Sequence, residues 1–275
     1  MRNTVRQKRV KKARVIPGFR CTFGIVVLML SLIVLIPLAS VLVYSLKISP
    51  GEFFSLLWKS NVRNAFLTSI GCSLVAAGIN TVFGVIVAWT LVKYDFPGKR
   101  IVDGLIELPF ALPTAVAGIT LSKLYSETGF FGKMLAGIGI KVTYTKTGLV
   151  IALVFVGLPF VIRAVQPVLE KLDGQYEEAA YMLGASPPEL RPAILTGFGL
   201  ALARGIGEYG SVIYISGNSA KEKTQVVSYV IMQKLSYIDY ESATAIALVM
   251  LVLSFVLLLF VNIVQARQAA RTNLL

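Results

Sequence analysis

Residues 21–46 read CTFGIVVLMLSLIVLIPLASVLVYSL and contain no charged side chain. A helix needs about 20 consecutive, mostly apolar residues to cross the hydrocarbon core of a bilayer, and this run exceeds that length. The run is also longer than the apolar core of a cleaved secretory signal, which spans about 7–15 residues, and no convincing small-residue cleavage site follows it. The stretch therefore predicts a retained membrane-spanning helix.

The segment before this run, residues 1–20, carries many lysines and arginines and no acidic residue. A basic stretch that abuts a spanning helix is typical of a cytoplasmic flank, and it also favours contact with anionic lipid head groups. No aromatic or basic groove accompanies it, so the net charge of +13 does not indicate nucleic-acid binding.

The composition of the whole chain agrees with a membrane protein. Of 275 residues, 56% are hydrophobic and only 15% are charged, and the mean hydropathy is +0.74. A water-soluble fold of this size cannot hide so much apolar surface. These figures exclude a soluble globular protein, a disordered chain and a small disulfide-stapled domain, and they predict an all-α, polytopic membrane protein.

Six membrane-spanning helices are expected from the apolar runs. Their approximate bounds are Cys21–Leu46, Asn64–Val92, Leu105–Leu124, Thr147–Val168, Pro192–Ser216 and Ala243–Val264. The second of these carries small residues every four positions, at Ser69, Ser73, Ala77 and Thr81. Such a face lets helix backbones approach closely, so it predicts a packed bundle.

The orientation follows from the distribution of lysine and arginine. More of them flank the spans on the side of the two termini, which places both termini in the cytoplasm. The predicted organisation is a basic tail over residues 1–20, a transmembrane domain over 21–265 with a cytoplasmic loop at about 170–191, and a second cytoplasmic tail over 266–275.

Several absences restrict the chemistry of the chain. It contains no histidine, which removes the commonest general base and metal ligand. Cys21 and Cys72 lie far apart in apolar stretches, so they indicate neither a zinc site nor a disulfide framework. The phosphate-binding pattern Gly-x4-Gly-Lys-Ser/Thr is also missing. We therefore expect no enzyme activity, no cofactor and no metal site.

Two charged residues fall inside the fifth expected span, in the run Arg204-Gly-Ile-Gly-Glu208-Tyr-Gly210. Ionisable groups within a bilayer usually face the bundle interior or a water-filled path, and residues four apart on a helix can pair. Three readings stay open: a neutralised pair that fixes helix register, a gate for an anionic substrate, or a pair at the membrane interface. Pro109 and Pro113 in the third span predict a kink of the kind that lines cavities.

The cytoplasmic loop at 170–191 is rich in acidic residues, which favours either a protein partner or a plain solvated loop. Within it, residues 177–186 read EEAAYMLGAS, a short helical stretch that stops at Gly184.

This loop resembles that of the permease subunits of binding-protein-dependent ATP-binding-cassette importers, which carry Glu-Ala-Ala-x3-Gly before the second-last span. The residues that match or flank this motif are Glu177, Glu178, Ala179, Ala180, Gly184 and Ala185. The resemblance implies that they form a coupling helix that docks on an ATPase subunit. It also implies the type I importer permease fold.

Other segments narrow the resemblance to the sulfate/thiosulfate permeases, and within them to the T-type subunits. They are residues 95–100 (DFPGKR), 108–118 (LPFALPTAVAG), 157–160 (GLPF), 166–170 (QPVLE) and 204–210 (RGIGEYG). The resemblance implies ATPase subunits, a second permease subunit of W type, an external sulfate-binding protein and a bacterial or plastid inner membrane. Arg204, Glu208, Pro109 and Pro113 would then lie along the translocation pathway or its gate.

One segment departs from the family pattern. After Gly184 the chain runs almost directly into residues 187–192 (PPELRP), which is shorter than the family pattern by roughly three helical turns. Two alternative functions stay open, a molybdate or tungstate permease of the same class and an ion-coupled secondary anion transporter. The latter does not account for the Glu-Ala-Ala loop.

Overall fold

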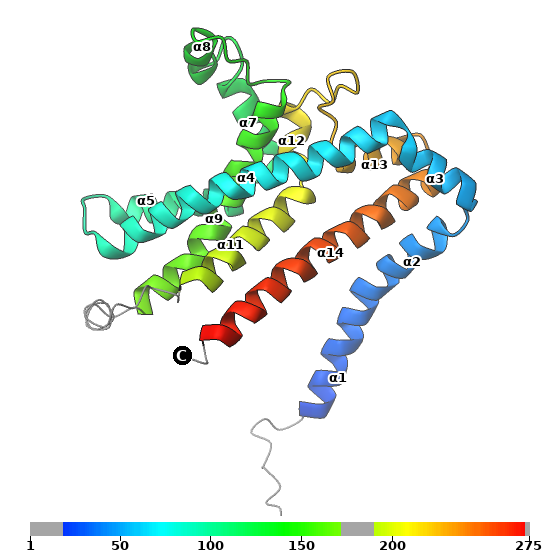
Figure 1. The fold of residues 1–275 in the computed structure, drawn as a ribbon, viewed down its shortest axis with the longest axis horizontal. Helices are drawn as coiled ribbons and strands as arrows, with labels where there is room; N and C mark the ends of the chain where they lie inside the picture. The colour runs from blue at the N-terminus through cyan, green and yellow to red at the C-terminus, as the bar shows by residue number, and fades with distance from the viewer. Residues whose placement is uncertain (1–18, 172–189, 273–275) are drawn as a thin grey trace, which may run out of the picture.

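The computed structural model describes residues 19–171 and 190–272, and within these ranges every regular element is a helix (Figure 1). The all-α prediction is therefore confirmed for the described residues. The elements are α1 (Phe19–Leu30), the π-helical turn η1 (Ser31–Leu35), α2 (Ile36–Ser45), α3 (Pro50–Trp58), α4 (Ser60–Lys93), α5 (Lys99–Ile106), α6 (Leu108–Ala111), α7 (Thr114–Leu124), α8 (Phe130–Ala136), α9 (Lys146–Lys171), α11 (Leu190–Ile206), α12 (Gly210–Ile215), α13 (Val227–Ser236) and α14 (Tyr240–Thr272).

The core is built by α4, α9 and α11, which pack against one another. Val161 of α9 is fully buried, and glycines face it from both neighbouring helices. A Cβ added to Gly84 would lie 2.7 Å from the Val161 side chain, and one added to Gly197 would lie 2.9 Å from its Cα. Small residues therefore set the spacing of this bundle. The two glycines are not part of the predicted small face, of which Ser69, Ser73 and Ala77 are buried and Thr81 is half-buried.

Four helices are long and apolar enough to cross a membrane: Cys21–Ser45, Ser60–Lys93, Lys146–Lys171 and Tyr240–Arg267. By length and composition they agree with the first, second, fourth and last expected spans. Pro159 and Pro167 do not interrupt α9, which stays one continuous helix of 26 residues.

The third expected span is not one kinked helix. It consists of Lys99–Ala111 and Thr114–Leu124, which meet at an angle of 112°. The break follows from Pro113, because a residue before proline is pushed out of the helical region, and Leu112 is extended with φ −86° and ψ 135°. At Pro109 the interruption is slight: α5 ends at Ile106 and α6 begins at Leu108, with Glu107 between them still near helical geometry, and Pro109 occupies the first turn of α6, where its missing N–H is tolerated.

The fifth expected span is also interrupted. Helix α11 has 17 residues and ends at Ile206, and α12 begins only at Gly210. The glycines at 205, 207 and 210 weaken the helix here, because glycine in a helix interior costs about 1 kcal/mol relative to alanine. Glu208 therefore lies beyond the helix end and not on the same helix as Arg204, which corrects the expectation of a shared helix face.

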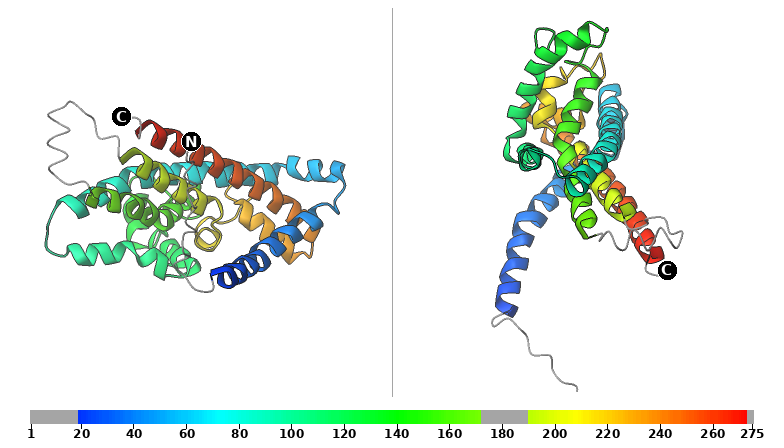
Figure 2. Two further views of the ribbon diagram at one scale, coloured as in Figure 1. Left: turned by 90° about the horizontal axis from the view of Figure 1, so that it is seen from below. Right: turned by 90° about the vertical axis from the view of Figure 1, so that its left-hand side faces the viewer.

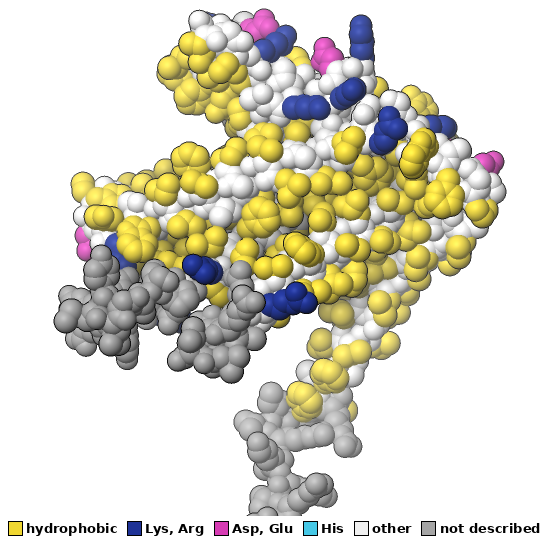
Figure 3. All heavy atoms as spheres, in the orientation of Figure 1, with side chains coloured by type: hydrophobic (Ala, Val, Ile, Leu, Met, Phe, Trp, Pro, Cys, Tyr) yellow, Lys and Arg dark blue, Asp and Glu magenta, His cyan; other side chains and the backbone are white. Residues whose placement is uncertain are grey.

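The N-terminal arm, formed by α1, η1 and α2, leans away from the bundle (Figure 2). Within the part of the chain that the structure describes, its main contact with another helix is that of α2 with α14. Its side chains are almost all exposed and apolar, and apolar side chains also cover the visible faces of α4 and α14 (Figure 3). This surface suits lipid or another membrane helix. The C-terminal ends of α9 and α14 lie along the lower edge in Figure 1, whereas α8, α12 and the loop after α12 lie toward the upper edge.

Candidate functional site

The candidate site is the break between α11 and α12. Arg204 lies in the last turn of α11, and Glu208 lies in the non-helical segment that follows. Their side chains form an ion pair, with 2.5 Å between Arg204 Nη1 and Glu208 Oε2. The Glu208 side chain is 1% exposed, and the Arg204 side chain is 35% exposed. The carboxylate is therefore buried inside the bundle, while the Arg204 side chain is partly exposed.

Both oxygens of Glu208 are used. Its Oε1 accepts hydrogen bonds from the Ser211 backbone N–H at 2.9 Å and from Ser211 Oγ at 3.1 Å, both at the start of α12. The Glu208 carbonyl accepts a third bond, from Ser228 Oγ of α13 at 2.8 Å. A buried carboxylate needs such partners to offset its lost hydration. Glu208 thus joins α11, α12 and α13 at one point.

The break is held by close approach of helices α4 and α7. A Cβ added to Gly118 of α7 would lie 2.4 Å from the Ser211 carbonyl oxygen, and one added to Gly205 would lie 3.1 Å from Ser73 Oγ of α4. Ser73 Oγ is buried and has no hydrogen-bond partner within the described residues. The surroundings of Arg204 and Glu208 are thus narrow and partly polar.

The two prolines of the predicted pathway differ in position. Pro113 precedes Thr114, whose Oγ1 meets the start of α12 so closely that a Cβ on Gly210 would clash with it at 2.1 Å. Pro109 lies in α6, which packs on α9, and its neighbour Phe110 makes an edge-to-face contact with Phe160 at 5.0 Å. Pro113 is therefore one residue from the contact between α7 and the start of α12, whereas Pro109 lies where α6 packs on α9.

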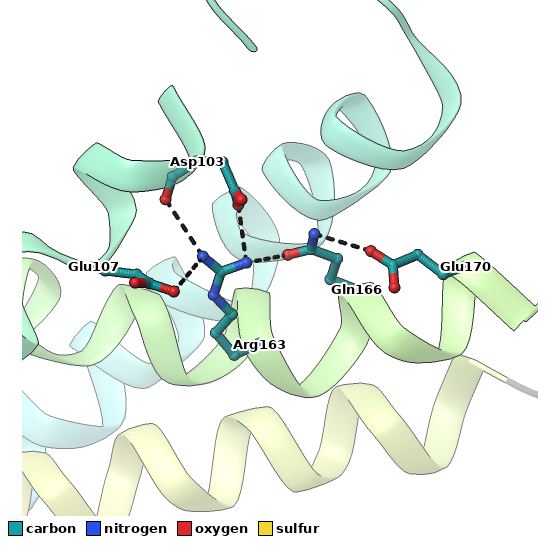
Figure 4. A network of polar contacts seen from close by, with 5 residues as sticks. All are labelled: Asp103, Glu107, Arg163, Gln166 and Glu170. Atoms are coloured by element: carbon teal, nitrogen blue, oxygen red, sulfur yellow. Dashed lines mark hydrogen bonds and ion pairs between the residues drawn. The ribbon is translucent and has the colours of Figure 1, made fainter. Parts of the chain in front are cut away.

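A second charged cluster links α5 to α9, and the sequence offered no sign of it beyond the presence of Arg163 near the end of a span (Figure 4). Arg163 Nη1 lies 2.8 Å from Asp103 Oδ1, and its Nη2 lies 2.7 Å from Glu107 Oε1. Gln166 Oε1 accepts from Arg163 Nη1 at 2.6 Å, and Gln166 Nε2 donates to Glu170 Oε1 at 3.0 Å. The acids lie 56 and 60 residues away in the sequence, so spacing alone could not pair them.

The predicted coupling residues, Glu177, Glu178, Ala179, Ala180, Gly184 and Ala185, lie outside the described residues. The described chain reaches the edge of that segment at Lys171, one residue after Glu170 of the second cluster. Within the described ranges no group of three histidine, cysteine, aspartate or glutamate residues could hold a metal ion.

Comparison with known proteins agrees with the fold and with the sequence motifs. Residues 80–273 match the family described as "Binding-protein-dependent transport system inner membrane component". The "Sulfate transport system permease protein CysT" of Salmonella typhimurium strain LT2 is 43% identical over 271 residues, which cover 95% of this chain and 98% of that protein.

The fold is similar to that of a solved transporter. A chain of a bacterial ABC transporter involved in import of the acidic polysaccharide alginate superposes with a TM-score of 0.74 at 16% identity, covering 90% of this chain and 95% of that one. A second structure of a bacterial alginate transporter, in complex with its pentasaccharide-bound periplasmic protein, gives a TM-score of 0.73 at 18% identity, covering 90% and 94%. At this identity the likeness concerns the fold alone.

Proposed function

Because the chain belongs to the family of binding-protein-dependent transport system inner membrane components, we propose that it is the permease subunit of an ATP-driven sulfate importer. The observation that supports sulfate as the substrate is the 43% identity to a sulfate permease over 98% of that protein's length. A transport subunit of this kind does no covalent chemistry, and ATP hydrolysis belongs to separate ATPase subunits. Thiosulfate is a second oxyanion of the same class.

The proposed topology has six membrane crossings. The bent pair Lys99–Ala111 and Thr114–Leu124 would form the third crossing, and α11 with α12 would form the fifth. Broken helices are tolerated in a membrane where neighbouring helices and polar side chains satisfy the freed backbone groups. Both termini would lie in the cytoplasm of a bacterium or in the equivalent plastid compartment, with the basic tail 1–20 on the lipid surface and 266–275 as the second tail.

The loop at about 170–191 is the proposed contact with the ATPase. Glu177, Glu178, Ala179, Ala180, Gly184 and Ala185 carry the motif for this docking. The loop follows directly on α9, which packs along α4 and α11, so a displacement of the loop would move the core of the bundle. A second permease subunit, of W type, would complete the pathway, and an external sulfate-binding protein would deliver the anion.

Arg204 and Glu208 are proposed to form part of the pathway or its gate. A guanidinium carries five N–H donors and binds oxyanions well, and the ion pair with Glu208 occupies Nη1. The N–H groups of Arg204 that do not bind Glu208 would attract a sulfate ion, while Glu208 would keep the net charge low enough for the ion to leave. Pro113 would support this gate by fixing the break beside α12, and Pro109 would shape the adjoining wall.

The test is uptake of labelled sulfate into cells that lack this chain and retain its partners. We expect the restored chain to recover ATP-dependent uptake that excess unlabelled molybdate barely inhibits. An empty vector is the negative control, and an uncoupler of ion gradients separates ATP-driven from ion-coupled transport. No recovery of sulfate uptake would refute sulfate as the substrate, and uptake that molybdate abolishes would make molybdate the preferred anion. Uptake that follows an ion gradient without ATP would refute the importer itself.

A further inference from the structure

Helix α3 (Pro50–Trp58) connects the first two candidate membrane spans. The first span ends at Ser45 and the second begins at Ser60, and α3 fills most of the segment between them. In Figure 1 it lies where the upper ends of α2 and α4 meet. Two spans that flank it so closely hold α3 at one surface of the bilayer, which is the outer surface in the proposed topology.

Both ends of α3 are fixed by hydrogen bonds. At the start, the Glu52 backbone N–H donates to Ser49 Oγ at 3.3 Å, and the Ser49 N–H donates to Glu52 Oε2 at 3.3 Å. At the end, the Lys59 N–H donates to the Leu56 carbonyl at 3.2 Å, and Lys59 leaves the helical region with ψ 133°. A helix of 9 residues is marginal in water by itself, so these caps and its packing stabilise it.

One face of α3 packs on the bundle. Leu56 is 3% exposed and belongs to a buried cluster with residues of α4, α13 and α14. Phe53 and Leu57 are half-buried against the same cluster. This packing fixes the rotation of α3 about its axis, and it therefore determines where the remaining side chains point.

The remaining side chains divide into an aromatic flank and a polar flank. Phe54 and Trp58, four residues apart, lie on one flank and are 66% and 76% exposed. Glu52 and Ser55, three residues apart, lie on the other flank and are also exposed. An amphipathic helix at a membrane interface shows this division, because one side meets lipid and the other meets water.

The aromatic flank continues onto the exposed surface at the end of the first span. Leu46 is 82% exposed and Tyr44 is 43% exposed, and the Lys47 ammonium lies 4.3 Å from the centre of the Tyr44 ring. Tyrosine and tryptophan are enriched at the level of the lipid head groups, where a lysine near a helix end also places its ammonium. Lipid therefore accounts for the whole of this surface, whereas water would leave two large aromatic rings and a leucine uncovered.

We propose that α3 is an interfacial helix that inserts Phe54 and Trp58 among the lipid head groups, while Glu52 and Ser55 face the water. In this position α3 anchors the depth at which the first span and α4 leave the bilayer. The proposal depends on the membrane location of this family and not on which anion is transported.

The first test compares two adjacent positions on the two flanks. Phe54→Cys and Ser55→Cys are made in a Cys21→Ala/Cys72→Ala background, and the complete transporter is placed in vesicles of phosphatidylethanolamine and phosphatidylglycerol. A membrane-impermeant maleimide is supplied on both sides of the vesicles, so the result does not depend on the topology. We expect the thiol of Ser55→Cys to react about tenfold faster, because a thiol surrounded by lipid does not form the reactive thiolate.

The control for this test is the same pair after unfolding in detergent, where both thiols should react at equal rates. A thiol in Ser55→Cys that reacts no faster than the one in Phe54→Cys in the vesicles would overturn the proposal.

The second test measures the depth of Trp58 by fluorescence quenching. Trp89→Phe leaves Trp58 as the last of the 2 tryptophans of this chain, and Trp89→Phe/Trp58→Phe leaves only the signal of the partner subunits. The difference between these two transporters is the fluorescence of Trp58. We expect lipid brominated near the head group to quench it about twice as strongly as lipid brominated near the chain end, and aqueous iodide to quench it weakly.

Three other results would each overturn the interfacial helix. Quenching by iodide alone would place Trp58 in water, and no quenching by either reagent would place it against another protein. Stronger quenching by bromine near the chain end would place Trp58 in the hydrocarbon core.

Discussion

The two arginine clusters of this protein differ in how they are built. Arg204 pairs with an acid four residues away, and that acid is sealed in the bundle with an exposed fraction of 1%. Arg163 pairs with Asp103 of α5 and with Glu107 just after it, and the side chains of these acids are 40% and 60% exposed. A buried charge that loses its partner is costly, whereas a partly exposed pair is screened by water and contributes little. The same residue type thus has a large role in one place and a modest one in the other.

The strongest test of this difference is Arg204→Ala. It leaves the Glu208 carboxylate buried without its cation, and we expect a loss of about 3–5 kcal/mol in the free energy of unfolding. Sulfate uptake should fall at least tenfold, since the proposed pathway loses its positive group. Unfolding in detergent and labelled-sulfate uptake measure the two effects.

The double variant Arg204→Gln/Glu208→Gln separates structure from transport. Removing both charges should restore much of the stability, because no unpaired charge remains buried. Uptake should stay low if Arg204 serves the anion pathway. Recovery of uptake together with stability would reduce the pair to a purely structural role, and unchanged uptake in Arg204→Ala would refute its part in transport.

A second prediction concerns the packing of α7 against α12 at Ser211, the residue that donates hydrogen bonds to Glu208. Gly118→Ala would place a Cβ 2.4 Å from the Ser211 carbonyl oxygen, so the backbone of α7 or α12 must move. We expect a loss of about 1–3 kcal/mol from this overpacking, together with reduced uptake. Gly78→Ala is the matched control, because a Cβ there meets nothing within 4 Å and should be neutral or slightly stabilising. Equal effects of the two changes would contradict the proposed tight contact.

The comparison also shows what the sequence could predict. The Arg204–Glu208 pair and the long apolar helices could be predicted from the sequence, because local spacing and hydropathy determine them. The family resemblance could also be predicted, because it rests on short motifs that are read directly from the sequence. The positions of the helix breaks at Leu112 and Gly207 were harder to predict. Proline and glycine weaken a helix, but the neighbouring helices decide whether it breaks.

Arg163 marks the limit of local reasoning. Its partner Asp103 comes from α5 and Glu107 lies between α5 and α6, and only the fold, in which α6 packs against α9, brings them within reach. The cavity that Lys141 and Lys146 line together with Glu222 and Thr224 has the same origin, because these two segments meet only in the folded chain. Pairings between distant segments depend on topology, and a single sequence without an alignment gives no register for them.

Arg163→Ala gives the third prediction and the direct counterpart to Arg204→Ala. We expect a loss of about 1 kcal/mol, because the guanidinium and its acids are partly hydrated and water compensates for the lost pairs. Most uptake should be retained. A double-mutant cycle with Asp103→Asn measures the coupling within the cluster, which should stay below about 1 kcal/mol. A loss as large as that of Arg204→Ala would overturn the contrast between the two clusters.

The smallest expected effect is at Asp239, which forms an ion pair with Lys234 outside the candidate membrane spans. A hydrogen bond from the Lys234 ammonium, 2.8 Å from Oδ2, lowers the pKa of the Asp239 carboxyl, and bonds from Ser242 at the start of α14 add to this. A depressed carboxyl pKa stabilises the fold above the unfolded value of about 3.9, and that stability is lost as the pH falls through the folded pKa. Asp239→Asn keeps an oxygen for the Ser242 N–H but removes the charge, so we expect a loss of a few tenths of a kcal/mol at pH 7.

The difference between wild type and Asp239→Asn should be constant from about pH 5 to 8 and vanish in acid, where the wild-type carboxyl is protonated too. Unfolding in detergent across this pH range measures it. Glu241→Gln is the matched control, since this nearby acid lies in the first turn of α14. A difference that grew toward low pH would have the wrong sign for a stabilised carboxylate. A loss of several kcal/mol at pH 7 would mean that burial does not separate the strong charge pairs of this protein from the weak ones.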